Sequence, residues 1–397
     1  MTNKGFPMVP LARVIGHRKE FITVDDLETY KRCRVQLHAQ GIVLRDIVSG
    51  SEIKTKKQQV CRAGEFLVAE IDAKVGGFGI VPDDLDGAIV SNHYFLFQID
   101  HTVLDCRFLD FFIRTPTFRD QVAAQGSTNY AAIRPNDVLG YKISLPPLEE
   151  QWRLVARIEE LAAKIEQARD LRREAVEEAG ALLSAASRNL FVSDGLKAPR
   201  GRLEHFATRI TKGESPEWQG FTYQELGPVF VRSENVGWGT LDLSRRTCIP
   251  EEFHHKLKRS QLQPGDVLIN LVGASIGRSC VVPADLGEAN VNQAVAVISP
   301  DSRQLDSNFL MHFLISAPAQ TTIHSGKVET ARPNISLGDL RNLILPVPPL
   351  FEQQRIVAYL DNLWAKVDAL KRLQAATNPE LGALLPSVLD KAFKGEL

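Results

Sequence analysis

The chain repeats itself at half its length, and this repeat limits its possible folds more than any other feature of the sequence. The segment PPLEEQWRLVARIEELAAKI, which begins at Pro146, realigns with PPLFEQQRIVAYLDNLWAKV, which begins at Pro348. At this constant offset of 202, 18 of the 46 positions from Pro146 to Phe191 are identical. Chance would give only a few identities, so we infer a tandem duplication. The chain is therefore expected to fold as two related halves.

The remainder of each half repeats more faintly. AGEFLVAEIDAKVGGFGIVP, from Ala63, aligns with PGDVLINLVGASIGRSCVVP, from Pro264, and the triplet Arg-Pro-Asn at Arg134 recurs at Arg332. Upstream of Ala63 and Pro264 the two halves have diverged most. The predicted parts are a first domain at 1–145, a central helix at 146–197, a second domain at 198–345 and a C-terminal helix at 346–397.

The segments 146–197 and 346–397 are predicted to be long helices. Each follows a Pro-Pro pair, and apolar residues then recur at alternating spacings of four and three, which is a coiled-coil pattern. The predicted seam residues are Leu154, Ile158, Leu161 and Ile165 in the first helix, and Ile356, Leu360, Leu363, Val367 and Leu370 in the second. Neither stripe can be buried alone, so we expect the helices to pack together antiparallel; the alternative is that each packs on its own domain. Asn378 and Pro379 are expected to break or kink the second helix.

The two domains are predicted to mix strands and helices. Runs such as GEFLVAEI, GAIVSNHYFLFQI, GDVLINLV and ANVNQAVAVI are β-rich and bounded by Gly, Pro or Asp. Helical stretches follow at 104–126 and 305–326, and each domain returns through a strand, YKISLPP or NLILPVPP, into its long helix. The predicted fold class is α+β, with two α/β domains joined by two long antiparallel coiled-coil helices in a pseudo-two-fold tandem repeat.

Composition limits the function. The 47 Lys and Arg residues against 48 Asp and Glu residues leave a net charge of −1, so DNA binding would need local basic patches rather than overall charge. No apolar run is long enough to predict a membrane span. The five cysteines show no Cys-x-x-Cys spacing, which argues against a zinc site or a disulfide framework and favours the cytoplasm.

No catalytic or metal-binding residue is predicted. Residues 273–279, GASIGRS, resemble a phosphate-binding loop, but the segment is one residue short and has Arg278 where lysine is needed. We interpret it as a tight turn between strands. His254 and His255 are interpreted as an exposed loop pair, because no further ligands follow at zinc spacing. The Asn/Asp-Pro-Pro-Tyr motif of amino-methyltransferases and the Gly-x-Gly-x-x-Gly motif of dinucleotide enzymes are absent from the sequence.

Local patches of basic and amide side chains are the candidates for binding. Residues 54–62, KTKKQQVCR, hold four cations and two amides without an acid. Lys and Arg neutralise phosphates, whereas Arg, Asn and Gln can hydrogen-bond to base edges. Both domains also end in a polar loop that leads into Arg-Pro-Asn. The candidate DNA-binding residues are Arg45, Lys54, Lys56, Lys57, Gln58, Gln59, Arg62, Lys74, Asn129, Tyr130 and Arg134 in the first domain, and Arg232, Asn235, Arg245, Arg246, Arg278, Lys327, Thr330 and Arg332 in the second. The alternative is a solvated charged face.

These features together resemble a known family. Two diverged domains alternate with two similar helices, each introduced by Pro-Pro-Leu-x-Glu-Gln and followed by Arg-[Leu/Ile]-Val-Ala, and the chain closes with AFKGEL. The arrangement resembles the specificity (S) subunit of type I restriction–modification enzymes, the HsdS family, over nearly the full length.

The resemblance implies a DNA-reading protein without catalysis of its own. Each domain would be a target-recognition domain that reads one half of a bipartite DNA site. The helices would set the half-site separation and dock two methyltransferase subunits, which motor-nuclease subunits would join. It implies no cofactor in this chain, since S-adenosylmethionine, ATP and Mg²⁺ would belong to the partner subunits. A nuclease or fused restriction enzyme with its own catalysis, or a coiled-coil scaffold, are the alternatives.

Overall fold

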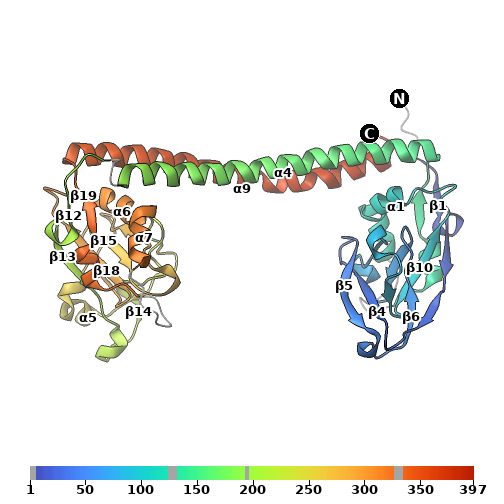
Figure 1. The fold of residues 1–397 in the computed structure, drawn as a ribbon, viewed down its shortest axis with the longest axis horizontal. Coiled ribbons are helices and arrows are strands. Elements are labelled where there is room, and N and C mark those ends of the chain that lie inside the picture. The colour runs from blue at the N-terminus through green and yellow to red at the C-terminus, as the bar shows by residue number, and fades with distance from the viewer. Residues whose placement is uncertain (1–5, 124–131, 193–195, 326–333) are drawn as a thin grey trace. The chain divides into compact units, whose positions relative to one another are not determined.

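The computed structural model describes residues 6–123, 132–192, 196–325 and 334–397. The chain divides into two compact units, and each unit takes in residues from both halves of the sequence. Unit 1 consists of Met1–Leu171 with Ala376–Leu397, and unit 2 consists of Arg172–Ala375. Each unit therefore contains one domain together with part of both long helices (Figure 1).

The first domain is built on a four-stranded antiparallel sheet in the order β2-β10-β7-β8. Its strands are β2 (Ile15–Arg18), β7 (Phe66–Ala69), β8 (Phe78–Ile80) and β10 (Tyr94–Ile99). The helices beside it are α1 (Cys106–Ile113), α2 (Pro116–Ala123) and α3 (Pro135–Gly140), and β1 (Met8–Pro10) pairs with β11 (Lys142–Ser144) next to the long helix. One core cluster joins sheet and helices through Phe66, Phe97 and Phe108.

A second sheet in the first domain lies mostly upstream of Ala63, where the two halves have diverged most, and takes one strand, at 89–90, from the part that repeats. Its order is β3-β6-β9-β4-β5, with antiparallel pairs except for β4 and β9, which are parallel. The strands are β3 (Phe21–Thr23), β4 (Thr29–Val35), β5 (Ile42–Ser49), β6 (Lys57–Val60) and β9 (Ile89–Val90). The sequence did not predict β3, β4, β5 and β6. The pattern of β4 is weak because only scattered residues such as Cys33 and Val35 are buried among charged neighbours.

The second domain repeats the first framework. Its four-stranded sheet has the order β13-β18-β15-β16, and β12 pairs with β19 beside the second long helix. These strands are β12 (Arg200–Arg202), β13 (Ala207–Lys212), β15 (Val267–Asn270), β16 (Ser279–Val281), β18 (Val295–Pro300) and β19 (Ile344–Pro346), and the helices are α6 (Ser307–Ile315), α7 (Ala317–Ser325) and α8 (Leu337–Asn342). In place of the five-stranded sheet, this domain has the parallel pair β14 (Gln224–Val231) and β17 (Ala289–Val291) with helix α5 (Glu251–Lys256).

The framework explains why particular glycines recur in both halves. Gly76 and Gly277, which the repeat aligns, both have a positive φ, of 82° and 84°. A Cβ at Gly76 would meet the backbone of His38 and Ala39, and a Cβ at Gly277 would meet the side chain of Gln320. The backbone conformation therefore favours glycine at both turns, and at Gly76 the backbone of the neighbouring segment leaves no room for a Cβ.

The long helices are α4 (Leu148–Phe191) and α9 (Leu350–Lys394). Of the break or kink predicted at Asn378 and Pro379, the break does not occur, because α9 continues through Pro379 and also through Pro386. A proline removes one backbone hydrogen bond and crowds the preceding turn. The residues around Pro379 are exposed, so water can satisfy the carbonyl group that loses its partner.

The two long helices pair antiparallel, as is evident within each unit separately (Figure 1). In unit 1, Arg153 near the start of α4 donates a 3.1 Å hydrogen bond to the carbonyl oxygen of Leu397. In unit 2, Phe191 at the end of α4 shares a core cluster with Ile356 and Leu360 near the start of α9. The predicted antiparallel coiled coil and the α+β fold class are therefore confirmed.

The predicted seam is buried or half-buried along both helices. Leu154 and Ile158 are fully buried, but they lie in one cluster with domain residues such as Leu109 as well as with Leu389 of α9. Packing between the helices and packing on a domain therefore occur together at the helix ends. Leu182 and Leu384, farther along the two helices, are exposed.

All five cysteines are free thiols; Cys106 is half-buried and the others are buried. None of the helices in the described ranges is both long and apolar enough to cross a membrane.

Candidate nucleic-acid interface

Three of the predicted residues line one cavity of about 380 Å³ in the first domain. Arg45 comes from β5, Lys54 from the turn that precedes β6, and Gln58 from β6. Residues that the sequence analysis did not select complete the wall: Arg32, Cys33, Glu52, Ile53, Thr55, Ile89, Val90, Ser91 and Tyr94. The cavity therefore brings cations, hydroxyl groups and an aromatic ring together on the sheet that distinguishes this domain from the second.

The two arginines in the wall of this cavity, Arg32 and Arg45, differ in how strongly they are bonded to Asp46. Arg32 forms a bidentate ion pair with Asp46, with both N–O distances at 2.7 Å, and this hydrogen bonding holds the pKa of Asp46 below its ordinary value. Arg45 is 59% exposed and reaches Asp46 only at 3.6 Å. Arg45 therefore keeps donors for an outside anion, whereas Arg32 is committed to the sheet.

Tyr94 lies in the wall of this cavity and close to a further arginine, Arg34. Burial raises the pKa of Tyr94, and the nearby cations Arg45 and Arg34 partly oppose that shift. Arg34 is exposed on β4, two residues beyond Arg32. The alternation in TYKRCRV, which puts Lys31, Cys33 and Val35 on the other side of the strand from Arg32 and Arg34, is the pattern that could have identified both arginines.

Other predicted residues of the first domain hold intramolecular partners. Lys56 pairs with Asp26 and donates to the carbonyl oxygen of Gly50 at 2.7 Å, and Lys57 lies over the Phe21 ring at 4.7 Å. Arg62 bonds Glu20 at 3.0 Å, and Lys74 lies in a short 3₁₀ turn at Asp72–Val75. These cations still contribute positive charge to the domain, but contacts within the domain already account for the positions of their side chains.

The predicted amide side chains Gln58, Gln59 and Asn235 are buried and already hydrogen-bonded to backbone groups. Gln59 is 3% exposed, and its amide nitrogen donates to the carbonyl oxygen of Tyr94 at 2.7 Å. Asn235 is 4% exposed, accepts a hydrogen bond from the backbone N–H of Arg232 and donates to the carbonyl oxygen of Asp242. We therefore correct the prediction for Gln59 and Asn235, which hold backbone segments together. The amide nitrogen of Gln58 is likewise bonded to Thr55, at 2.6 Å.

In the second domain the structure does not gather the predicted residues into one cavity among the described ranges. Arg245 and Arg246 are exposed, Arg278 is half-buried beside the turn between β15 and β16, and Arg232 is bonded to Glu234. Arg134, in the first domain, precedes α3 with a 71% exposed side chain, 3.7 Å from Glu70. The predicted residues Asn129, Tyr130, Lys327, Thr330 and Arg332 lie outside the described residues.

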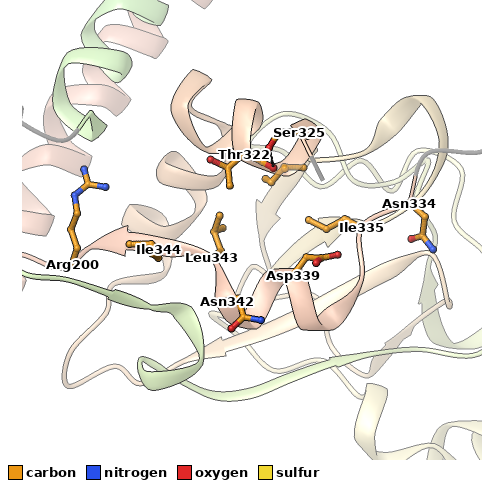
Figure 2. A pocket seen from close by; sticks show the side chains of 10 residues that line it. Arg200, Thr322, Ser325, Asn334, Ile335, Asp339, Asn342, Leu343 and Ile344 are labelled. Carbon is orange, nitrogen blue, oxygen red and sulfur yellow. Dashed lines mark hydrogen bonds between the residues drawn. The ribbon is translucent and has the colours of Figure 1, made fainter. Parts of the chain in front are cut away.

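A cavity of about 590 Å³ in the second domain is shown in Figure 2. Arg200 and Ile344 stand at one end of its wall and Asn334 at the other. Its polar groups are already used locally: the Asp339 carboxylate accepts hydrogen bonds from the backbone N–H and the hydroxyl of Ser336, and the Asn342 amide donates to the carbonyl oxygen of Gly338. The described wall therefore offers polar contacts but no pairing of a nucleophile with a base.

The segment that resembles a phosphate loop is a turn, as predicted. Gly273–Ser275 forms a 3₁₀ turn between the antiparallel strands β15 and β16, whereas a phosphate loop leads from a strand into a helix. The prediction for His254 is wrong, because this residue is 6% exposed and its Nδ1 lies 2.5 Å from Oδ1 of the buried Asn290. Within the described ranges, no three His, Cys, Asp or Glu side chains cluster as a metal site would.

The glutamine of the repeated Pro-Pro-Leu-x-Glu-Gln motif has the same three hydrogen bonds in both units. Gln151 donates to the carbonyl oxygens of Val103 and Pro146, at 2.9 and 2.8 Å, and accepts from the backbone N–H of Asp105 at 2.9 Å. Gln353 is bonded in the same way to Gln304, Pro348 and Asp306, each at 2.8 Å. Both glutamines are fully buried. The motif thus joins the first turn of each long helix to a domain.

Comparison with known proteins agrees with this architecture. Residues 229–377 match the family described as type I restriction modification DNA specificity domain. The HsdS subunit from Thermoanaerobacter tengcongensis superposes with a TM-score of 0.68 at 28% identity, covering 99% of this chain and 97% of that one. The chain is therefore similar to specificity subunits of type I restriction–modification systems, by sequence at 229–377 and by fold over nearly its whole length.

Two further comparisons show how far the likeness extends. A chain from a study of complex assembly and conformational transition of the type I restriction–modification system has a TM-score of 0.74 at 28% identity, covering 99% of this chain and 98% of that one. The Escherichia coli type I restriction enzyme EcoBI specificity subunit is 34% identical over 171 residues, which are 43% of this chain and 36% of that protein. The likeness to solved structures thus spans nearly the whole chain, whereas the match to this curated relative covers about a third of its length.

Proposed function

We propose that the chain is the DNA sequence-specificity subunit of a type I restriction–modification system and has no catalysis of its own. Each domain would read one half of a bipartite DNA site, and the paired helices would set the distance between the half-sites. The observation that carries the proposal is the duplication itself: two domains with one framework, each fixed by the same glutamine contacts to the start of a long helix. A protein with internal pseudo-two-fold symmetry suits two half-sites and two equivalent partners.

The middle of the helix pair supports this symmetry at the atomic level. Arg172 donates from its guanidinium to the carbonyl oxygen of Gln374 at 2.5 Å, and Gln374 donates from its amide to the carbonyl oxygen of Arg172 at 3.0 Å. These positions are 202 apart, the offset of the repeat. Equivalent residues that bond each other reciprocally lie on a two-fold axis. These reciprocal bonds lie near the middle of both helices, where a symmetric spacer would have its centre.

The first domain would contact DNA through Arg45 and Lys54 at the edge of its cavity. Cations that keep donors available can neutralise phosphates, and Arg can also pair with a guanine edge. The second domain would use Arg245, Arg246 and Arg278. Because the two domains differ in the parts that carry Arg45, Lys54, Arg245 and Arg246, the two half-sites would have different sequences.

Two partner subunits, which we take to be methyltransferases, would dock on the long helices. Leu171 and Leu182 are 58% and 59% exposed, and Leu373 and Leu384, at the equivalent positions, are 67% and 45% exposed. The repeat aligns Leu171 with Leu373 and Leu182 with Leu384. Exposed leucines repeated at the same positions are more consistent with two equivalent docking sites than with scattered surface residues. S-adenosylmethionine, ATP and Mg²⁺ would bind to the methyltransferase and motor-nuclease subunits.

The proposal is tested by producing the chain with and without the methyltransferase subunit of the same system, followed by mapping of methylated adenines across a genome. We expect methylation of one bipartite sequence only when both proteins are present. Identical methylation with and without this chain would refute the proposal. DNA cleavage by the purified chain alone would favour the nuclease alternative, and normal DNA reading after removal of both domains would favour the scaffold.

A further inference from the structure

The repeated glutamines are saturated with hydrogen bonds in a way that links two different parts of each unit. The amide nitrogen of Gln151 bonds Pro146, in its own lead-in, but also Val103, in the loop before α1. Its amide oxygen accepts from Asp105, the residue that caps α1. Both N–H donors and the oxygen are therefore used, and two of the three bonds cross from the long helix to the domain.

The residue at the far end of these bonds is itself fixed. The Asp105 carboxylate accepts hydrogen bonds from the backbone N–H groups of Arg107 and Phe108, at 2.8 and 3.2 Å. In unit 2, Asp306 caps α6 by accepting from the backbone N–H of Phe309 at 3.0 Å. Each glutamine thus connects the first turn of a long helix to the first turn of a domain helix through one capping residue.

Apolar packing alone would leave the orientation less determined. The neighbouring residues Leu154 and Val155 are buried in the core cluster, but contacts between methyl groups have little directional preference. Hydrogen bonds do have such a preference, and a buried amide that loses its partners is strongly disfavoured. Three bonds from one side chain therefore define the direction in which the helix leaves the domain.

We infer that Gln151 and Gln353 are positioning residues that fix the orientation of each recognition domain on its long helix, and thereby the half-site separation that the protein accepts. This inference rests on the proposed function, because a separation has meaning only for a bipartite site. Neither glutamine touches DNA in this scheme. Each acts through the helix direction, and each acts on one domain only.

The test uses Gln151→Met and Gln353→Met, which keep the length of the side chain but remove its hydrogen bonds. Gln151→Glu and Gln353→Glu are companion variants that keep an acceptor and lose the two donors. Gln167→Met on α4 and Gln354→Met on α9, where the glutamines are exposed, are matched controls. All are produced in full length with the methyltransferase subunit.

Two measurements are made on each variant. Hydrogen exchange followed by mass spectrometry reports the backbone N–H of Asp105 and of Asp306. We expect Gln151→Met to accelerate exchange at Asp105 by about tenfold or more and to leave Asp306 unchanged, with the reverse for Gln353→Met. Methylation mapping then gives the ratio of methylated sites whose separation is one base pair off to those with the normal separation. We expect this ratio to rise by about tenfold, comparable to the loss of one base-pair contact.

The outcomes separate orientation from stability. A variant that is merely destabilised loses methylation at all sites in proportion, with an unchanged ratio. A proportional loss of this kind would overturn the inference if the backbone N–H of Asp105 or Asp306 has also lost its protection from hydrogen exchange. It would leave the proposed function intact. An unchanged exchange rate would overturn the inference as well. A wild-type complex that methylates no bipartite sequence would instead refute the proposed function, and the inference with it.

Discussion

The two domains share a framework and differ in what is attached to it. Both have the same four-stranded sheet order, and in both a buried carboxylate is bonded by an arginine from the first strand of that sheet. Arg18 bonds Glu65 at 2.7 Å in the first domain, and Arg209 bonds Asp266 at 2.6 Å in the second. Since both carboxylates are at most 5% exposed, these pairs belong to the fold rather than to a binding surface.

The attached parts share only a parallel strand pair, β4 with β9 in the first domain and β14 with β17 in the second, and otherwise differ. The first domain adds a five-stranded sheet with a cation-lined cavity, and the second adds the parallel pair β14–β17 and helix α5. A constant framework with variable additions indicates two separate roles. The framework sets the position of the domain on its helix, and the additions select the DNA sequence. The predictions below test whether the framework is equivalent in both units and whether the additions carry the DNA contacts.

The largest effect is expected where each long helix ends on the opposite domain. Phe191 packs against Phe309 and Phe313 with ring centroids 5.5 and 5.6 Å apart. In unit 2 it is 1% exposed, so Phe191→Ala should lower the free energy of unfolding by about 4 kcal/mol. Urea unfolding gives this value, and hydrogen exchange assigns it to unit 2.

The equivalent substitution in unit 1 is the control for this comparison. Phe393 lies 5.1 Å from both Phe108 and Phe112, but it is only half-buried. Phe393→Ala should therefore cost about half as much, and its exchange should rise in unit 1. Losses of equal size that spread over both units would contradict the view of two separately packed, equivalent frameworks.

The next effect concerns the additions. In the complex with the methyltransferase, Arg45→Ala with Lys54→Ala should remove two phosphate contacts. DNA affinity should then fall by about tenfold or more at 0.1 M salt, and the slope of log K against log salt should become less steep by about 1.8. The matched control is Lys56→Ala with Arg62→Ala, which removes the same charge from residues bonded to Asp26 and Glu20. Equal changes in the salt slope for both pairs would show that only bulk charge matters.

The architecture could be predicted from the sequence because repetition and periodicity act over long stretches. The offset of 202 predicted two similar helices, and the spacing of Leu154, Ile158 and Ile165 predicted a buried seam that the structure confirms. Local rules were less reliable where packing overrides them. Pro379 was expected to break or kink α9, yet the helix continues through it, in a stretch whose exposed backbone can be hydrated.

The candidate site was predicted less well, since composition does not reveal what a polar side chain already binds. Gln59 and Asn235 have the chemistry to read bases, but burial commits them to backbone groups. Arg34 was overlooked because its strand was not recognised. The sequence could not distinguish these cases, because hydrogen-bond partners come from segments that are distant along the chain.

The smallest effect concerns one position where the frameworks differ. Asp110 and Arg114 of α1 form an ion pair, whereas the aligned residues of α6 are Met311 and Ile315. Burial raises the pKa of Asp110 against the opposing effect of Arg114. The folded state therefore binds this proton more tightly than the unfolded chain does. The protonated Asp110 therefore contributes stability that is present below the ordinary carboxyl pKa and is lost as the pH rises through the raised pKa.

Replacing this pair by the residues of unit 2, with Asp110→Met and Arg114→Ile, should thus stabilise unit 1 at pH 7 by up to about 1 kcal/mol, and the gain should shrink toward pH 4. Urea unfolding across this pH range measures the change, with the exposed Asp120→Asn as control. A gain that is constant with pH would mean that apolar packing, and not the carboxylate, separates the two frameworks here.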